Sequence, residues 1–178
     1  MHKPASPPAE DQRLQTLREL LLLDTAPEAR FDAVTAYAAF TFKVGISLVT
    51  LVDSRRQWFK SAFGLDVCET SREVSFCAHV ILQDEIFEIP DAREDPAFFD
   101  NPLVTGEPFI RFYAGYPLTM DNGAHVGTLC LIDREPKRLS DWEREHLIIL
   151  ARMVTAELQG RPGDSVEGHV DLGRRAPG

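Results

Sequence analysis

The alternation of hydrophobic and polar positions predicts helices towards both ends of the chain and strands between them. Residues 13–23 carry six leucines, more apolar surface than one narrow stripe needs, which predicts a helix with a packing partner. Residues 28–42 place an apolar side chain at every third or fourth position, which predicts a second helix. Thr25, Pro27 and Glu28 fit a capping box at its start.

The middle of the chain has the two-residue period of strands. Residues 44–53 are apolar on both alternating faces, which predicts a central strand covered on both sides. Residues 57–63 follow a tight turn and complete a hairpin, whereas residues 65–73 read as loop. Further strands are predicted at 86–89, 109–118 and 126–133, the last two joined across Asn122-Gly123.

Two further segments complete the pattern. Ser75 is predicted to cap a short, half-buried helix that carries Cys77 and His79. Residues 91–106 are acidic and proline-containing, and we expect a loop that covers a site. Ser140 opens a capping box for a last helix reaching about Gln159, whose apolar stripes are wide enough to pack on the sheet and to meet a second subunit.

These elements make one α+β domain over residues 12–160, with a mostly antiparallel sheet of five or six strands. Residues 1–11 have nothing to bury, so we expect them to be disordered. Residues 161–178 are expected to form a flexible tail.

Composition narrows the function. A formal charge of −9 argues against nucleic acid and anionic membranes as partners. The three cysteines cannot form an even disulfide framework, and no Cys-x-x-Cys spacing indicates metal or redox chemistry. No signal-peptide core and no run of about 18 apolar residues occurs, so we expect a cytoplasmic protein that does not span a membrane.

Six motifs in order carry a resemblance to a known family. They are Leu23-Asp24-Thr25-Ala26-Pro27-Glu28, Arg56-Gln57-Trp58-Phe59-Lys60-Ser61, Ser75-Phe76-Cys77-Ala78-His79, Asn101-Pro102-Leu103-Val104, Arg111-Phe112-Tyr113-Ala114-Gly115 and Gly127-Thr128-Leu129-Cys130-Leu131-Ile132-Asp133. Over residues 13–159 the chain resembles the GAF domains of bacterial signalling proteins, in the subgroup found ahead of histidine kinase or diguanylate cyclase output domains.

The resemblance implies a GAF/PAS-like sheet with a ligand pocket on one face and terminal helices, often dimeric, on the other. It further implies that ligand-induced strain passes through those helices to an output domain or partner protein. The chain lacks the Asn-Lys-x-Phe-Asp-Glu signature of members that bind cyclic nucleotides. The missing signature argues against a cyclic nucleotide as the ligand. Cys77 and His79 precede the Asn101 loop, whereas a bilin-binding cysteine follows it, which argues against a bilin. We expect no cofactor.

The predicted pocket lies between the helix at 75–82, the loop at 91–106 and the strand at 110–116. Arg111 is placed either to hold a ligand carboxylate or phosphate or to pair with an acidic residue of the loop. Aromatic residues there serve either as packing or as stacking groups. The candidate ligand contacts are Trp58, Ser75, Phe76, Cys77, His79, Asp91, Phe98, Phe99, Asn101, Arg111 and Tyr113.

We expect a binding domain, with no catalytic residues and no metal site. Cys77 and His79 are two residues apart on a helix and so point in different directions, and His125 with Cys130 does not complete a zinc spacing. One alternative is a thiol enzyme like the GAF-fold free methionine sulfoxide reductases, although residues 91–106 lack the cysteine that carries their chemistry. The other is a ligand-free dimerisation module with a filled core. For the binding domain, we expect the signal to leave through the first and last helices, which form a parallel homodimer seam.

Overall fold

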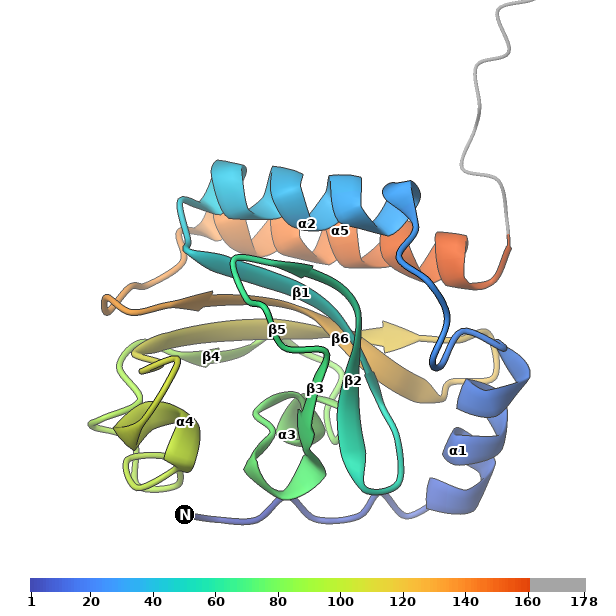
Figure 1. The fold of residues 1–178 in the computed structure, drawn as a ribbon, viewed down its shortest axis with the longest axis horizontal. Helices are drawn as coiled ribbons and strands as arrows, with labels where there is room; N and C mark the ends of the chain where they lie inside the picture. Colours follow the sequence, from blue (N-terminus) through green and yellow to red (C-terminus); the bar gives the residue numbers. More distant parts are fainter. Residues whose placement is uncertain (161–178) are drawn as a thin grey trace, which may run out of the picture.

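The computed structural model describes residues 1–160 and shows one six-stranded antiparallel sheet, in the order β3-β2-β1-β6-β5-β4 (Figure 1). The strands are β1 (Ile46–Val52), β2 (Arg56–Phe63), β3 (Glu69–Ser71), β4 (Phe87–Ile89), β5 (Phe112–Thr119) and β6 (His125–Asp133). The helices are α1 (Glu10–Glu19), α2 (Ala29–Phe42), α3 (Cys77–Val80), α4 (Pro102–Thr105) and α5 (Asp141–Leu158), with a 3₁₀ turn η1 (Arg72–Val74).

The sheet confirms the predicted α+β class. Every residue of β1 is buried, as expected for a strand whose two faces are both apolar, and β1 pairs with β2 and β6. Gly123 has a φ of 83° in the turn between β5 and β6, a conformation that glycine adopts without steric cost. The short edge strand β3 replaces the loop predicted over residues 65–73, because three residues are too few for an alternating pattern to show.

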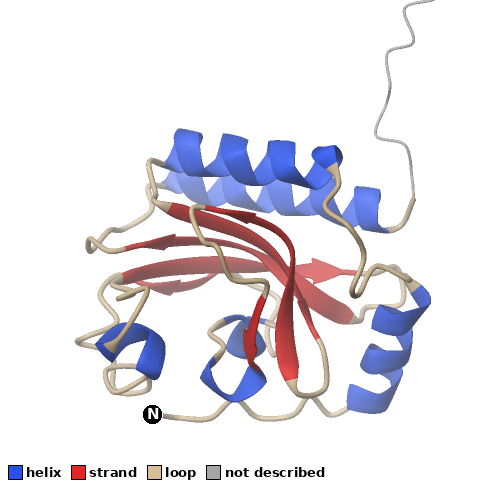
Figure 2. Cartoon of the chain, in the orientation of Figure 1, coloured by secondary structure: helices blue, strands red, loops and turns tan. Residues whose placement is uncertain are grey.

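Helices cover the sheet differently on its two faces (Figures 1 and 2). The long helices α2 and α5 lie side by side on one face, and the short helices α3 and α4 lie on the other with their loops. The α1 helix lies at one end of the sheet, where Leu14 and Leu17 join the core. The helix beside α5 within the domain is therefore α2 rather than the first helix. The seam between copies through the first and last helices stays a prediction.

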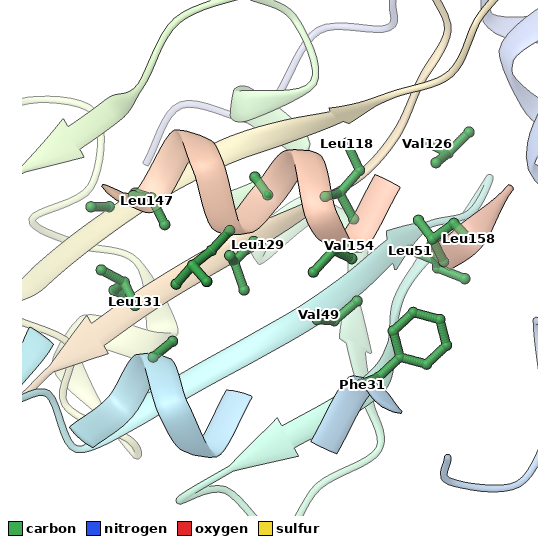
Figure 3. Packing of buried hydrophobic residues seen from close by; sticks show 14 of the residues in the cluster. Phe31, Val49, Leu51, Leu118, Val126, Leu129, Leu131, Leu147, Val154 and Leu158 are labelled. Carbon is green, nitrogen blue, oxygen red and sulfur yellow. The ribbon is translucent and has the colours of Figure 1, made fainter. Parts of the chain in front are cut away.

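The core between the long helices and the sheet is built mainly from aliphatic side chains, with the aromatic rings of Phe31, Phe42, Trp58 and Phe112 among them (Figure 3). Ser140 caps α5 through the predicted capping box with Glu143. The inward stripe of α5 is buried and packs on β5 and β6, whereas α2, which carries Phe31, packs on β1 and β2. The labelled residues of this core are Phe31, Val49, Leu51, Leu118, Val126, Leu129, Leu131, Leu147, Val154 and Leu158.

The link between α1 and α2 differs from the prediction. The first helix ends at Glu19 rather than at residue 23, and Leu21 and Asp24 take positive φ angles of 55° and 59°. Helix α2 begins at Ala29, and no side chain caps it. The Thr25 capping box is wrong because the Thr25 hydroxyl donates to the carbonyl of Leu22 (2.6 Å).

The N-terminal residues also depart from the prediction of disorder. The backbone N–H of His2 donates to the carbonyl of Ala97 (3.0 Å), and Lys3 pairs with Glu73 (3.1 Å). This N-terminal segment, residues 1–9, runs beneath α4 and α3 to reach α1 (Figure 1). Its order comes from polar contacts to distant residues, which composition does not reveal. The tail predicted at 161–178 lies outside the described residues.

Candidate functional site

Ser75 positions the single-turn helix α3 from its buried side. Its hydroxyl accepts the backbone N–H of Ala78 (3.1 Å), so it caps the turn as predicted, and it also contacts the side-chain carbonyl of Gln57. Ser75 is 1 % exposed. The hydroxyl thus fixes α3 on β2, and its buried position leaves it a structural role.

Aromatic rings meet beneath α3. Phe76 stacks on Phe98 with ring centroids 4.3 Å apart, and it lies 5.1 Å from the ring of Tyr113. His79 meets the edge of Phe98 at 4.9 Å, and burial lowers the pKa of its imidazole. We call Phe76, His79, Phe87, Phe98 and Tyr113 the aromatic cluster. Its rings occupy the space in which the sequence predicts a ligand.

Two thiols lie beside the Tyr113 hydroxyl. The Cys77 sulfur is 3.1 Å from this oxygen and 3.8 Å from the sulfur of Cys130 in β6. A methyl group on Gly115 would stand 2.6 Å from the same hydroxyl, so this position has room for glycine alone. Cys68 is exposed and is not part of this group.

Burial governs the titration of these groups. It raises the pKa of Tyr113 and of Cys130 well above their ordinary values, because a charge there would be removed from water. Burial acts in the same direction on Cys77, but hydrogen bonds from Cys130, Thr128 and Tyr113 outweigh it and lower the pKa of Cys77 to about 7. Cys77 is therefore the thiol of the pair that ionises first.

The loop after β4 is held by its own polar side chains. Asn101 accepts the N–H of Leu103 (2.9 Å) and donates to the carbonyl of Val74 (3.0 Å), which leaves it 1 % exposed. Asp91 is bonded by Arg93 (2.6 and 3.0 Å), and this hydrogen bonding lowers the pKa of the Asp91 carboxyl. Both residues thus serve to shape the loop.

Arg111 bonds to backbone carbonyls, and its role in holding a ligand stays a prediction. It precedes β5, and its guanidinium donates to the carbonyls of Val104 (2.9 Å) and Ile110 (3.0 Å). These bonds tie the loop of α4 to the start of β5. The positive charge of Arg111 also helps to lower the pKa of Asp91 in the loop.

The remaining candidate residues separate into three groups. Phe76, Cys77, His79, Phe98 and Tyr113 come together beneath α3, as the sequence predicts. Trp58 packs in the core between the long helices and the sheet, which places it on the opposite face. Phe99 is 54 % exposed and points away from the cluster that its neighbour Phe98 joins. Within residues 1–160, no group of three or more metal-binding side chains occurs.

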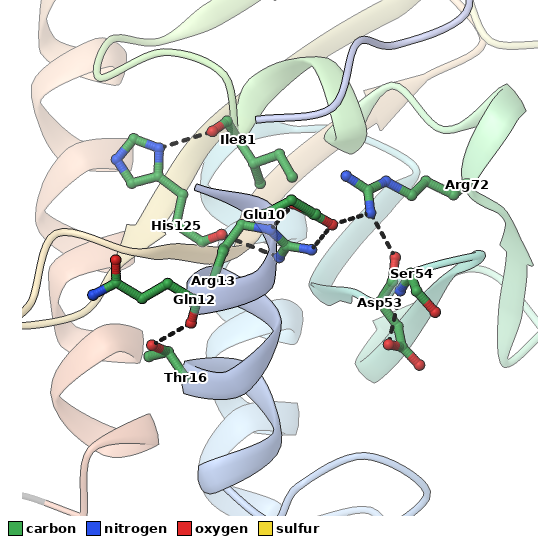
Figure 4. Close-up of polar contacts among 9 residues, drawn as sticks. All are labelled: Glu10, Gln12, Arg13, Thr16, Asp53, Ser54, Arg72, Ile81 and His125. Atoms are coloured by element: carbon green, nitrogen blue, oxygen red, sulfur yellow. Dashed lines mark hydrogen bonds and ion pairs between the residues drawn. The ribbon is translucent and has the colours of Figure 1, made fainter. Parts of the chain in front are cut away.

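A hollow of about 580 Å³ lies elsewhere on this side, between the N-terminal segment and the turn from β1 to β2. Glu10 closes one side of it, because Arg13 (2.7 Å) and Arg72 both donate to its carboxylate, and Arg72 also donates to the carbonyl of Asp53 (3.1 Å) (Figure 4). Burial raises the pKa of Glu10, but these bonds outweigh it and lower the value to about 2. Sequence reasoning missed this hollow because residues 1–11 were expected to be disordered.

The same N-terminal turn of α1 is also anchored to β6. His125 contacts the carbonyl of Ile81 through Nδ1 (3.0 Å), and Arg13 donates to the carbonyl of His125 (3.3 Å) (Figure 4). The α1 helix is thereby joined to both α3 and β6, so a displacement of α3 has a direct route to the first helix.

A second polar network joins two of the motifs quoted above. Arg56 donates twice to Asp24 (2.8 Å each) and once to Glu69 (2.8 Å). The ammonium of Lys60 is fully buried and pairs with Glu28 (2.6 Å) while donating to the Thr25 hydroxyl (2.8 Å). These contacts hold the α1–α2 link on β2. Sequence reasoning did not pair these residues, because about thirty positions separate them.

Comparison with known proteins gives one curated relative of interest. A cyclic di-GMP phosphodiesterase of Pseudomonas aeruginosa is 42 % identical over 159 residues, which cover 89 % of this chain and 27 % of that protein. The chain thus spans about a quarter of its relative's length. Helices of residues 1–160 include none long and apolar enough to cross a membrane.

Solved structures share the fold at low identity. The GAF domain of an Acinetobacter phosphoenolpyruvate-protein phosphotransferase superposes with a TM-score of 0.61 at 19 % identity, covering 84 % of this chain and 94 % of that one. The free methionine-R-sulfoxide reductase of Neisseria meningitidis gives 0.62 at 16 %, covering 90 % and 96 %. The GAF domain family model matches residues 14–158. This match, together with the six-stranded sheet and its helices, shows that the chain belongs to the GAF domain family, a sensory and regulatory fold.

Proposed function

We propose that the chain is a non-catalytic regulatory domain that acts as a homodimer, in which the outer face of α2 and α5 in one copy meets that of another. The observation that carries this proposal is an apolar stripe on the side of α5 that faces away from the sheet. Trp142, Ile149 and Met153 are 59, 52 and 54 % exposed, and His146 lies between them. The intervals of four, three and four residues are those of a coiled-coil seam.

The stripe extends onto α2 and is held in place there. The ring of Trp142 stacks on His146 at 4.8 Å, and the hydroxyl of Tyr37 lies 2.9 Å from Nε2 of His146. Phe40, one turn further along α2, is 86 % exposed. A continuous exposed surface of large apolar side chains is typical of a protein interface. We call these residues, Tyr37, Phe40, Trp142, His146, Ile149 and Met153, the outer stripe.

The position of α5 supports a signalling role for this dimer. Helix α5 follows β6, and β6 lies in the middle of the sheet with the side chain of Cys130 against α3. A displacement on the α3 side is thereby coupled through β6 to the dimer helix. By analogy with the phosphodiesterase relative, we propose that the domain regulates an output enzyme or partner protein in the bacterial cytoplasm. We expect the chain itself to leave cyclic di-GMP and free methionine sulfoxide unchanged.

The small-molecule receptor implied by the family resemblance is the second candidate. The observation in its favour is the hollow of about 580 Å³ beside the N-terminal segment, large enough for a small organic ligand. The aromatic cluster gives less support, because a ligand there must displace packed rings. A thermal-shift screen of nucleotides, amino acids and carboxylates tests this candidate. A ligand that stabilises the wild type but not Arg55→Ala would assign it to the hollow, which Arg55 lines.

Light scattering on the full chain tests the dimer. At tens of micromolar, we expect the wild type to have the mass of two chains and the double variant Phe40→Glu/Met153→Glu to have the mass of one, because charges would be buried at the seam. Val67→Glu is the matched control, since Val67 is 49 % exposed and lies outside the outer stripe. We expect this control to remain dimeric. A wild type with the mass of one chain would exclude the proposal.

A further inference from the structure

Two cysteines far apart in the sequence meet in the interior of the domain. Cys77 begins α3, Cys130 lies in the middle of β6, and their sulfur atoms are 3.8 Å apart. They are 1 % and 0 % exposed. The dimer proposal above makes no use of the chemistry of these thiols. The sequence does not predict their approach, because their spacing indicates no known motif.

The geometry is close to that of a disulfide. A disulfide requires sulfur atoms about 2.05 Å apart, so the two atoms must approach by about 1.8 Å, which rotation of the side chains and a small shift of α3 supply. The α3 helix is a single turn, and loops flank it on both sides. Gly115 in β5 pairs with Cys130 in β6. Because glycine has no side chain, it leaves room for the Tyr113 hydroxyl beside both sulfurs.

We propose that Cys77 and Cys130 form an intrachain disulfide when the folded domain encounters a peroxide, and that thiol reductants reverse it. Cys77 is the attacking group and Cys130 the resolving group. The two positions are joined by geometry rather than by sequence, since 53 residues separate them.

The reaction proceeds in two steps. The Cys77 thiolate attacks one oxygen of hydrogen peroxide, so that an S–O bond forms and the O–O bond breaks. The released hydroxide takes up the proton that Cys77 gave away and becomes water. Cys130 sulfur then attacks the sulfenic sulfur, the S–S bond forms and the S–O bond breaks, and the departing hydroxide leaves as water with the Cys130 proton. Two thiols lose two electrons, and the peroxide is reduced to two waters.

The order of attack follows from the environment of each thiol. Cys77 receives hydrogen bonds that favour its thiolate, whereas burial keeps Cys130 protonated. Because both sulfurs are buried, the oxidant reaches them only when α3 opens locally. We therefore expect this reaction to be slower than modification of exposed Cys68.

The disulfide would connect α3 covalently to the central strand that leads into α5. This link restricts the movement of α3 relative to the sheet. Oxidation would thereby reach the long-helix face through a bond inside the domain, whether or not that face dimerises.

Peptide mapping of the native full chain tests the proposal. The protein is treated with hydrogen peroxide, its free thiols are blocked with N-ethylmaleimide, and it is digested without reductant for mass spectrometry. We expect a linked pair of peptides containing Cys77 and Cys130, lighter than their sum by two hydrogens and separated by dithiothreitol. Circular dichroism verifies that the treated chain is folded.

Variants and an unfolded control distinguish native geometry from chance pairing. Cys68→Ser should form the same link, whereas Cys130→Ser should abolish it and leave Cys77 as a sulfenic acid that dimedone captures. In urea, the shorter loop between Cys68 and Cys77 closes at lower entropic cost, so that pair should gain at the expense of the native one. A folded wild type whose main link includes Cys68, or whose Cys77 and Cys130 remain free thiols, would overturn the proposal.

Discussion

The two faces of the sheet are covered by different kinds of structure. On one face, α2 and α5 are long helices that bury mainly aliphatic side chains inward and present the outer stripe to solvent. On the other, α3 and α4 have four residues each, and the interior consists of the aromatic cluster, two thiols and neighbouring aliphatic side chains. Polar bonds from side chain to backbone hold the second covering together.

This contrast separates two tasks. Long helices move as rigid units, so the α2/α5 face is suited to contact a second copy. Single turns joined by loops have fewer backbone bonds to lose, so the α3 face is where a local rearrangement costs least. A chemical change at Cys77 or His79 therefore acts on the more deformable covering.

The largest expected effect tests whether the side chains beneath α3 form a packed core. Phe98→Ala should lower the free energy of unfolding by about 3–5 kcal/mol, because the ring is buried and stacks on Phe76. Phe99→Ala, next in the chain but 54 % exposed, should cost less than about 1 kcal/mol. Urea unfolding measures both. Equal, small losses would mean that the space beneath α3 is open, as the sequence predicts for a ligand pocket.

An intermediate effect is expected from the polar bonds of the α3 side. The pKa of Glu10 is about 2 in the folded chain against an ordinary 4.5, so the stability it contributes is present above about pH 4.5 and is lost as the pH falls towards 2. Allowing for solvent screening, Glu10→Gln should cost about 1–2 kcal/mol at pH 7.

Unfolding curves of wild type and Glu10→Gln between pH 7 and pH 2.5 measure this contribution. Their difference in unfolding free energy should shrink as the pH falls. Glu145→Gln on α5 is the control, because Glu145 is exposed and lies on the other face, and it should leave stability unchanged. A Glu10→Gln difference that stays constant with pH would show that the ion pairs with Arg13 and Arg72 do not support the fold.

The smallest effect concerns the long-helix face. Ser140 accepts the N–H of Glu143 (3.2 Å), and the Glu143 carboxylate accepts the N–H of Ser140 (2.8 Å). Ser140→Ala should cost about 1 kcal/mol in unfolding free energy, because the first turn of α5 loses a hydrogen-bond acceptor. Ser140→Asp keeps an acceptor and should restore most of the loss. A full loss in both variants would point to a cause other than the cap.

Local patterns predicted the elements that local interactions decide. The alternation over 44–63 and 109–133 gave two hairpins, and the Ser140 box gave the start of α5. The two stripes of α5, one through Leu147 and one through Ile149 and Met153, were also visible in the sequence and are respectively buried and exposed. Each of these features depends on the hydrophobic period within one segment, and that period can be read directly from the sequence.

The sequence by itself therefore determined the α+β fold, its GAF family and the residues that gather beneath α3. Only the tertiary structure decided that rings fill the space there, that Trp58 lies on the other face, and that Thr25 and Glu28 meet Lys60 instead of capping a helix. It also decided the order of residues 1–9 and the approach of Cys77 to Cys130. The physical reason is that filled volume and long-range polar pairing depend on side chains from several segments at once, and no single segment encodes them.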